Sequence, residues 1–237
     1  FIHLNFYPEG GWLVQGLQNK VAFEATDNHG APLNIEGVLI NQNGDVLRKI
    51  NTYYDGMGLF NFIPKADEKY YVKINNPMQV DTVYQLPEPV KSGYVLSLVQ
   101  TEKSITDVRI SMTPDLKGKK VKLSLFNGLT SSNIFESELS EEKRFSFLTS
   151  KYPVGMATLT LFSEKNIPVA ERLIFLNKDK SMKLSIETDK KSYEPREKVE
   201  MIIKAVDFNG NPASANLSLS VTEDSRMLNE QSDISSY

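Results

Sequence analysis

Apolar and polar residues alternate with a period of two along most of the sequence, and turn-forming residues separate the alternating stretches. A period of two places successive side chains on opposite faces of a β-strand, so each stretch predicts a strand with one buried face. The alternating apolar sets are Val21/Phe23/Ala25, Phe60/Phe62, Tyr70/Val72/Ile74, Val108/Ile110/Met112, Val121/Leu123/Leu125, Ala157/Leu159/Leu161, Met182/Leu184/Ile186 and Val199/Met201/Ile203/Ala205. Because no amphipathic helices alternate with these strands, the pattern predicts an all-β chain of tandem antiparallel β-sandwiches.

Two further stretches extend this pattern. Residues 136–144 have the composition of a helix, but we expect two strands joined by a charged turn there. Near the C-terminal end, Leu217, Leu219 and Val221 alternate with hydroxyl residues, which predicts another strand with one face in water.

One turn sequence, Asp-x-x-Gly-x-Pro, occurs twice between alternating stretches. Asp27 opens the first copy, where its side chain can accept a hydrogen bond from a backbone N–H two residues later. Gly30 can take a positive φ without a Cβ clash, and Pro32 follows where no ladder N–H is needed. The corresponding residues of the second copy are Asp207, Gly210 and Pro212. A weaker third copy has Asn166 in place of the glycine, two residues before Pro168. Asparagine tolerates positive φ best after glycine, so the three turns together predict three related β-domains.

The boundaries of these domains follow from breaks in the alternation. Residues 75–93 contain three prolines and little regular alternation, which is typical of a linker, and the polar run 177–181 is a second joint. We therefore expect sandwiches at 1–86, 87–178 and 179–237. The third stretch has only about four predicted strands where such a sandwich usually has about seven, so we expect it to be truncated. Since the sequence ends in a polar run, we expect the chain to be a segment of a longer protein.

Composition excludes several classes of function. The chain has 237 residues, 24% of them charged, with a net charge of −3, so no overall field attracts nucleic acid or an anionic membrane. The one dense basic run, 117–120, is interpreted as a solvated hairpin tip. There is no cysteine, hence no disulfide or thiolate chemistry. No apolar run is long enough to span a membrane.

No residue pattern predicts catalysis. Of the two histidines, His3 leads into a predicted strand and His29 lies in a turn, so we expect structural or exposed roles for both. The acidic and amide residues around Asp27 and Asp207 lack the ligand count of a calcium loop. The glycines of Gly10-Gly11 do not open a helix, so they are interpreted as a tight turn. We expect no catalytic residues, no metal and no cofactor.

The aromatic residues leave one binding question open. Tyr7, Trp12, Tyr53 and Tyr54 could form an exposed platform for a sugar or a peptide. Core packing and cross-strand pairs are the more usual role of such side chains, so both interpretations stand.

The stretch SYEPREKVEMIIKAVDFNGNPASANLSLSVTED resembles the macroglobulin-type, immunoglobulin-like domains of the alpha-2-macroglobulin superfamily. The matching positions are Tyr193, Pro195, Glu197, Val199, Asp207, Gly210 and Pro212. Arg196 stands where the family has glycine. The first 75 residues resemble domains of large extracytoplasmic bacterial proteins, some of which are linked to TonB-dependent receptor plug domains.

The resemblance implies stacked modules that present surfaces to proteases or other partners. Because the family's thioester needs a cysteine, covalent trapping is not encoded in this chain. We therefore expect a non-enzymatic structural and protein-interaction segment, extracytoplasmic in the periplasm or at the outer membrane. Its partners would be other domains of the same longer chain, a protease or an outer-membrane receptor. The alternative is a glycan- or peptide-binding accessory domain of a TonB-dependent outer-membrane uptake system.

Overall fold

The computed structural model describes residues 1–77, 82–102, 104–140 and 142–221. The first seven strands form a sandwich of two antiparallel sheets, with the strand orders β1-β2-β5 and β4-β3-β6-β7. Their bounds are β1 (His3–Pro8), β2 (Asn19–Thr26), β3 (Glu36–Asn41), β4 (Val46–Asn51), β5 (Met57–Phe62), β6 (Tyr70–Asn76) and β7 (Val83–Gln85). The alternating residues predicted to face inward do so: Val21, Phe23 and Ala25 are buried between the sheets with Val72 and Ile74.

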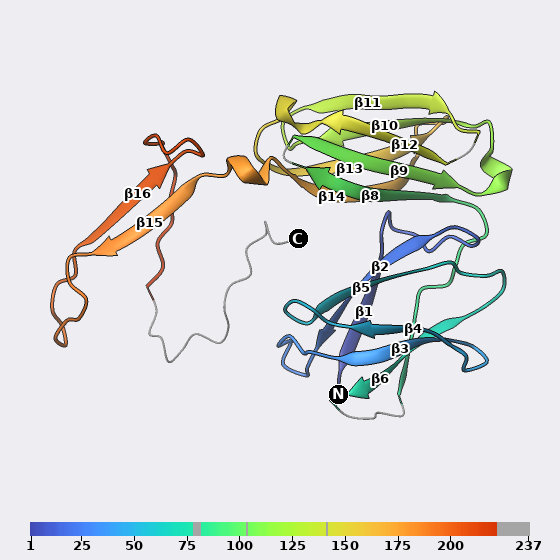
Figure 1. The fold of residues 1–237 in the computed structure, drawn as a ribbon, viewed down its shortest axis with the longest axis horizontal. Helices are drawn as coiled ribbons and strands as arrows, with labels where there is room; N and C mark the ends of the chain where they lie inside the picture. Colours follow the sequence, from blue (N-terminus) through green and yellow to red (C-terminus); the bar gives the residue numbers. More distant parts are fainter. Residues whose placement is uncertain (78–81, 103, 141, 222–237) are drawn as a thin grey trace.

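The next seven strands form a second sandwich with the same strand order, β8-β9-β12 facing β11-β10-β13-β14. Their bounds are β8 (Tyr94–Glu102), β9 (Ile105–Met112), β10 (Lys120–Phe126), β11 (Ser131–Glu138), β12 (Lys143–Leu148), β13 (Gly155–Ser163) and β14 (Pro168–Leu176), with short 3-10 turns η1 (Pro114–Leu116), η2 (Thr149–Lys151) and η3 (Lys178–Lys180). Its core is separate from the first and includes Leu123 and Leu159. The prediction of tandem immunoglobulin-like antiparallel sandwiches is confirmed. Figure 1 shows the first sandwich beneath the second, on the side of the second where β8 and β14 lie.

The charged stretch 136–144 belongs to this second sandwich. β11 ends at Glu138 and β12 begins at Lys143, so the prediction of two strands in place of a helix is confirmed. Residue 141 of that turn lies outside the described residues, as do residues 78–81 of the expected linker. The expected linker is shorter than 75–93, because β7 pairs with β6 and Leu86 is buried in the first core.

Up to residue 221, the third unit has two strands, β15 (Lys183–Thr188) and β16 (Met201–Val206), which pair with each other. Their register repeats that of β1 and β2 at a constant offset: His3 pairs with Thr26, and Lys183 pairs with Val206. Each pair is followed by the Asp-x-x-Gly-x-Pro turn. β15 and β16 therefore occupy the places that β1 and β2 take in the first sandwich.

Two sequence predictions for this unit are wrong within the described residues. Residues 217–221 form no strand, and Leu184 and Ile186, predicted to face a core, are exposed. Both differences have one cause: no described strand lies beside residues 217–221 or across from the β15–β16 face. A strand without a partner has no hydrogen-bond ladder, and a two-stranded ribbon cannot bury an apolar face alone. The part of the chain beyond residue 221 lies outside the described residues.

The third copy of the turn does not occupy an equivalent place. Asn166 has φ +57 and joins β13 to β14, which are neighbours in one sheet. The turn at Gly30 instead leads from β2 in one sheet to β3 in the other. Asn166 therefore does not mark in the second sandwich the corner that Gly30 marks in the first, although the backbone conformation at the turn is shared. Within the described residues there is also no helix with the length and apolar character needed to cross a membrane.

Candidate functional site: the joint between the first two sandwiches

A buried glutamate connects the first sandwich to the second. Glu9 follows β1, and its side chain is only 3% exposed. Its Oε1 accepts a hydrogen bond from the backbone N–H of Leu98 in β8 at 3.2 Å and pairs with Nη1 of Arg172 in β14 at 2.8 Å. Lys20 of β2 contributes a further charge, with Nζ at 3.5 Å from Oε2 of Glu9, and donates to the Leu98 carbonyl at 3.2 Å. Glu9 and Lys20 thereby bind both polar groups of one residue on the edge of β8.

The backbone beside Glu9 also meets the second sandwich. Gly10 has φ +90, and a Cβ at this position would lie 3.3 Å from the backbone nitrogen of Leu96. Its carbonyl accepts a hydrogen bond from the N–H of Glu171 in β14 at 3.3 Å, forming an isolated antiparallel bridge. A glycine is therefore needed here both for the positive φ and for the close approach of the two backbones.

The loop that follows holds the linker. Asn19 is buried, accepts from the Val14 N–H at 2.9 Å and donates to the Val14 carbonyl at 2.8 Å. This loop, residues 9–18, then pairs with the linker at Val90. The N–H of Val90 donates to the carbonyl of Leu13, and the carbonyl of Val90 accepts from the N–H of Gln15. Val90 is thus held by the first sandwich just before the chain enters β8.

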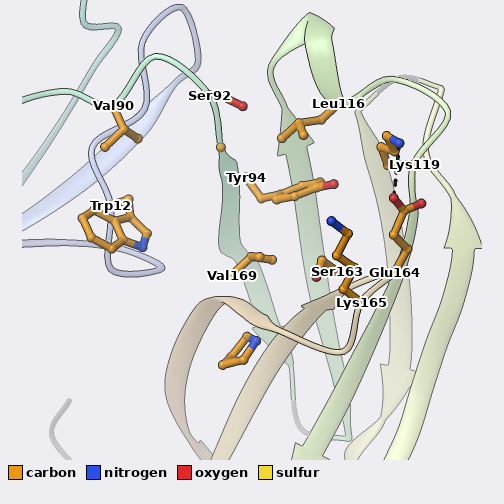
Figure 2. A pocket seen from close by; sticks show the side chains of 12 residues that line it. Trp12, Val90, Ser92, Tyr94, Leu116, Lys119, Ser163, Glu164, Lys165 and Val169 are labelled. Carbon is orange, nitrogen blue, oxygen red and sulfur yellow. Dashed lines mark hydrogen bonds and ion pairs between the residues drawn. The ribbon is translucent and has the colours of Figure 1, made fainter.

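The same loop exposes Trp12 beside a small pocket, which we call the Trp12 pocket. Its volume is about 480 Å³, within the roughly 300–1,000 Å³ typical of small-molecule sites. Its lining comes from the loop, the linker, the start of β8, η1 with the residues after it, and the β13–β14 turn with the adjoining ends of both strands. The lining residues are Trp12, Val90, Ser92, Gly93, Tyr94, Leu116, Lys119, Ser163, Glu164, Lys165, Pro168 and Val169. Figure 2 shows Trp12 and Val90 on one side of the pocket, Lys119 and Glu164 on the other, and Tyr94 between them.

The polar groups of the Trp12 pocket are few and defined. Nζ of Lys119 lies 3.2 Å from Oε1 of Glu164, and this ion pair forms the rim opposite the indole. Burial raises the pKa of the Tyr94 phenol above its ordinary value, and the carboxylates of Glu164 and Asp115 raise it further. Tyr94 is therefore a neutral hydroxyl at physiological pH, able to donate and to accept. An apolar wall with an exposed indole and such groups suits an uncharged polar ligand.

A second, larger hollow lies between the two sandwiches, and we call it the inter-sandwich cleft. Its volume is about 1,350 Å³. Tyr7, Leu59 and Tyr53 line it from the first sandwich, and Leu173 and Phe175 of β14 line it from the second. Burial raises the pKa of Tyr7, and the nearby Glu24 carboxylate raises it further.

The structure divides the four aromatic residues of the predicted platform. Tyr7 and Tyr53 both line the inter-sandwich cleft, whereas Trp12 lines the separate Trp12 pocket. Tyr54 is exposed and lines neither hollow. His3 and His29 are exposed, and among the described residues no three histidine, cysteine, aspartate or glutamate side chains gather as a metal site.

The two full turn copies share one hydrogen-bond pattern. Oδ1 of Asp27 accepts from the N–H groups of His29 and Ala31, and Oδ1 of Asp207 accepts from those of Asn209 and Asn211. These bonds hold the pKa of both carboxyls below the ordinary range. The residues after them have matching roles: Gly30 and Gly210 have φ +80 and +88, and Pro32 and Pro212 bridge back to the preceding strand. In the third copy, Pro168 pairs with Phe162.

Sequence reasoning missed the residues that build the joint. Nothing in the local pattern distinguishes Glu9 from a solvated carboxylate in a turn, because its partners lie far along the chain. Asn19 also lacked a signal, since a buried asparagine and a surface asparagine look alike in sequence. The one available hint was Gly10-Gly11, where two glycines allow backbone to approach backbone.

Comparison with known proteins finds weak similarities to strand-built modules of larger proteins. No protein-family model matches the sequence, and no curated protein matches it. Solved structures with a similar arrangement include trypsin-activated alpha-2-macroglobulin from Escherichia coli (13% identity, TM-score 0.27, 87% of this chain), of whose length this chain spans only 19%. Others are the adhesin InvE of Yersinia pseudotuberculosis (9%, 0.29, 75% of this chain and 59% of that one) and a tetra-tandem repeat from the extending region of a large adhesion protein (9%, 0.33, 88% and 64%). These similarities are too weak to assign a function.

Proposed function

We propose that this chain is a non-enzymatic structural and protein-interaction segment whose first two sandwiches act as one stiff arm. The proposal extends to a macroglobulin-like architecture, an extracytoplasmic bacterial setting and partners among other domains of a longer chain, a protease or an outer-membrane receptor. Its domains are proposed at 1–86, 87–178 and 179–237. The observation that supports it is the buried Glu9 cluster, which binds one sandwich to the edge strands of the next.

A flexible tether would not need this chemistry. Ordinary interfaces between domains are polar and allow relative motion. Here a carboxylate is removed from water and its charge is balanced by Arg172 and Lys20 of different sandwiches. Because a buried carboxylate is costly when its partners move away, the cluster favours one orientation of the sandwiches. Fixed orientation is what a spacing and presenting segment requires.

The stiffness of the arm can be measured directly. The chain has no cysteine, so a double substitution such as Lys49→Cys with Leu129→Cys places one spin label on each sandwich. We expect a single narrow distance distribution by double electron–electron resonance. A broad or multimodal distribution would contradict the proposal, and the same labels placed within one sandwich provide the width expected for a rigid body.

The Trp12 pocket favours a second candidate, ligand binding by an accessory domain of an uptake system. Trp12 is 57% exposed and lies beside apolar walls, the Tyr94 hydroxyl and the Lys119–Glu164 ion pair. Aromatic faces with nearby polar groups are suited to sugars and short peptides. Pocket volume and exposed indole together are the specific support for this candidate.

The single tryptophan makes this candidate easy to test. Because Trp12 is the chain's one tryptophan, its intrinsic fluorescence reports on the pocket. Titration with a panel of neutral oligosaccharides is expected to change the emission, and Trp12→Ala is expected to weaken binding by about tenfold, measured by calorimetry. Tyr54→Ala, an exposed aromatic outside both hollows, is the matched control. No change in emission with any saccharide, or equal loss in both variants, would exclude the pocket as a sugar site.

A further inference from the structure

We propose that the free edge of β14 in the inter-sandwich cleft accepts an extended, alternately apolar polypeptide strand from a partner protein. This inference rests on the proposed interaction function and names the surface and the kind of partner. Among the described residues, β14 pairs with no strand other than β13, so it is an edge of its sheet. An edge strand carries backbone N–H and C=O groups that a further strand can bind.

The bridge to Gly10 shows which groups of β14 face away from β13. The N–H of Glu171 donates to Gly10 of the first sandwich, on the side of β14 opposite β13. Backbone groups alternate sides along a strand, and the β13–β14 register is continuous from Ala170 to Leu176. The N–H and C=O groups of Leu173 and Phe175 therefore point to the same free edge as those of Glu171.

The first sandwich covers only the beginning of this edge. Gly10 meets Glu171, and Pro8, two residues before Gly10, is the residue that this antiparallel register would place opposite Leu173. Pro8 belongs to β1 and pairs with Val21, so the chain diverges from β14. The hydrogen-bond ladder between the first sandwich and β14 thus begins at their interface and ends after the single bridge of Gly10 and Glu171. An entering strand that runs antiparallel to β14 would continue the ladder that Gly10 begins.

The neighbouring edge strand is already protected. β8 would offer its own edge, but Glu9 binds the Leu98 N–H and Lys20 binds the Leu98 carbonyl. Natural proteins commonly protect edge strands with inward-pointing charges of this kind. In the described part of the chain, no charged side chain binds the backbone of Leu173 in this way, and Leu173 is 61% exposed. Of these two edge strands, β14 is therefore the one that the described part of the chain leaves open.

The walls of the cleft specify the character of the strand. Leu173 and Phe175 line the cleft from β14, while Tyr7, Leu59 and Tyr53 line it from the first sandwich. A strand seated between them turns alternate side chains toward the tyrosines and Leu59, so those positions should be apolar. The volume, about 1,350 Å³, exceeds the roughly 300–1,000 Å³ of small-molecule sites, which favours a polypeptide over a metabolite. Figure 1 shows β14 and β8 along the side of the second sandwich that faces the first.

The test uses a short synthetic peptide of alternating valine and threonine with lysine at both ends, carrying a fluorophore. Binding to the full chain is measured by fluorescence anisotropy. N-methylation of the alternate amides that face β14 removes their hydrogen bonds, and it is expected to weaken binding by about tenfold or more. N-methylation of the remaining alternate amides, which face away from β14, leaves the hydrogen bonds to β14 intact and is expected to change binding by less than about threefold.

Protein variants provide the matching control. Leu173→Pro removes an N–H that points to the free edge, a position where proline is tolerated in a sheet, whereas Leu173→Ala keeps the N–H and shortens the side chain. We expect Leu173→Pro to lose most peptide binding and Leu173→Ala to retain much of it, with melting temperatures of both close to that of the wild type. If Leu173→Pro unfolds the sandwich, the two methylated peptides still decide the question with the unmodified protein.

Three outcomes would overturn the proposal. In the first, the unmethylated peptide shows no saturable binding. In the second, both methylated peptides bind equally well, which indicates apolar capture without strand addition. In the third, sedimentation shows that the chain is a dimer and that Leu173→Pro abolishes the dimer, which assigns the edge to a second copy. Failure here leaves the narrow spin-label distribution of the stiff arm unaffected, so the two proposals are separable.

Discussion

Glu9→Ala is expected to release the second sandwich from the first. The substitution leaves the Arg172 guanidinium and the Leu98 N–H without their shared acceptor, and it leaves Lys20 without its carboxylate. Removing one member of a buried ion cluster costs about 3–5 kcal/mol, and the partial exposure of both cations places this case at about 3 kcal/mol. We expect the distance distribution between labels on the two sandwiches to broaden markedly.

Glu9→Gln is the matched control for this prediction. The amide keeps an oxygen that accepts from Leu98 but removes the charge that pairs with Arg172. It should therefore broaden the distribution less than alanine does. If the alanine variant keeps the narrow distribution of the wild type, the joint is held by something other than Glu9, and the reason given for the stiff arm is wrong.

Gly58→Ala is expected to destabilise the first sandwich selectively. A Cβ at this position would lie 2.5 Å from the backbone oxygen of Asn51 and still closer to the ring of Phe23, which is fully packed in the core. A backbone oxygen cannot move aside as a flexible side chain can, so the cost is at the upper end of overpacking, about 3 kcal/mol. For a domain of this size, the melting temperature should fall by about 15 °C.

Gly44→Ala separates this steric effect from the effect of backbone conformation. Gly44 has φ +86, but a Cβ added there would meet nothing within 4 Å, so its cost is the left-handed strain alone, about 1–2 kcal/mol. Hydrogen exchange in β2 follows unfolding of the first sandwich, and hydrogen exchange in β10 follows unfolding of the second. Equal loss in the two variants would contradict the packing argument. Equal destabilisation of β10 would show that the two cores unfold as one unit.

The period-two pattern predicted most strands because it reflects a local requirement. Val121, Leu123 and Leu125 alternate in sequence and are all buried in the second core. The same pattern at Leu184 and Ile186 predicted a buried face that the described structure does not cover. Alternation states which face a strand would bury, but burial itself needs a partner sheet.

The repeated turn shows a similar limit. The sequence predicted positive φ at Gly30, Asn166 and Gly210, and all three have it. Sheet order then separates them, because Gly30 and Gly210 each follow the second strand of their unit while Asn166 joins the last two strands of the second sandwich. A turn involves only four residues, so its sequence does not determine which strands it connects.

The sequence by itself therefore determined the class of fold, the faces of the strands, the turns and the absence of cysteine chemistry. These depend on periodicity and on single residues, whose preferences act over a few positions. Only the tertiary structure decided that Glu9 is buried between two sandwiches, that Trp12 and Tyr7 line different hollows, and that no strand among the described residues other than β13 pairs with β14. Those features arise from contacts between residues separated by many tens of positions, and no local pattern encodes such contacts.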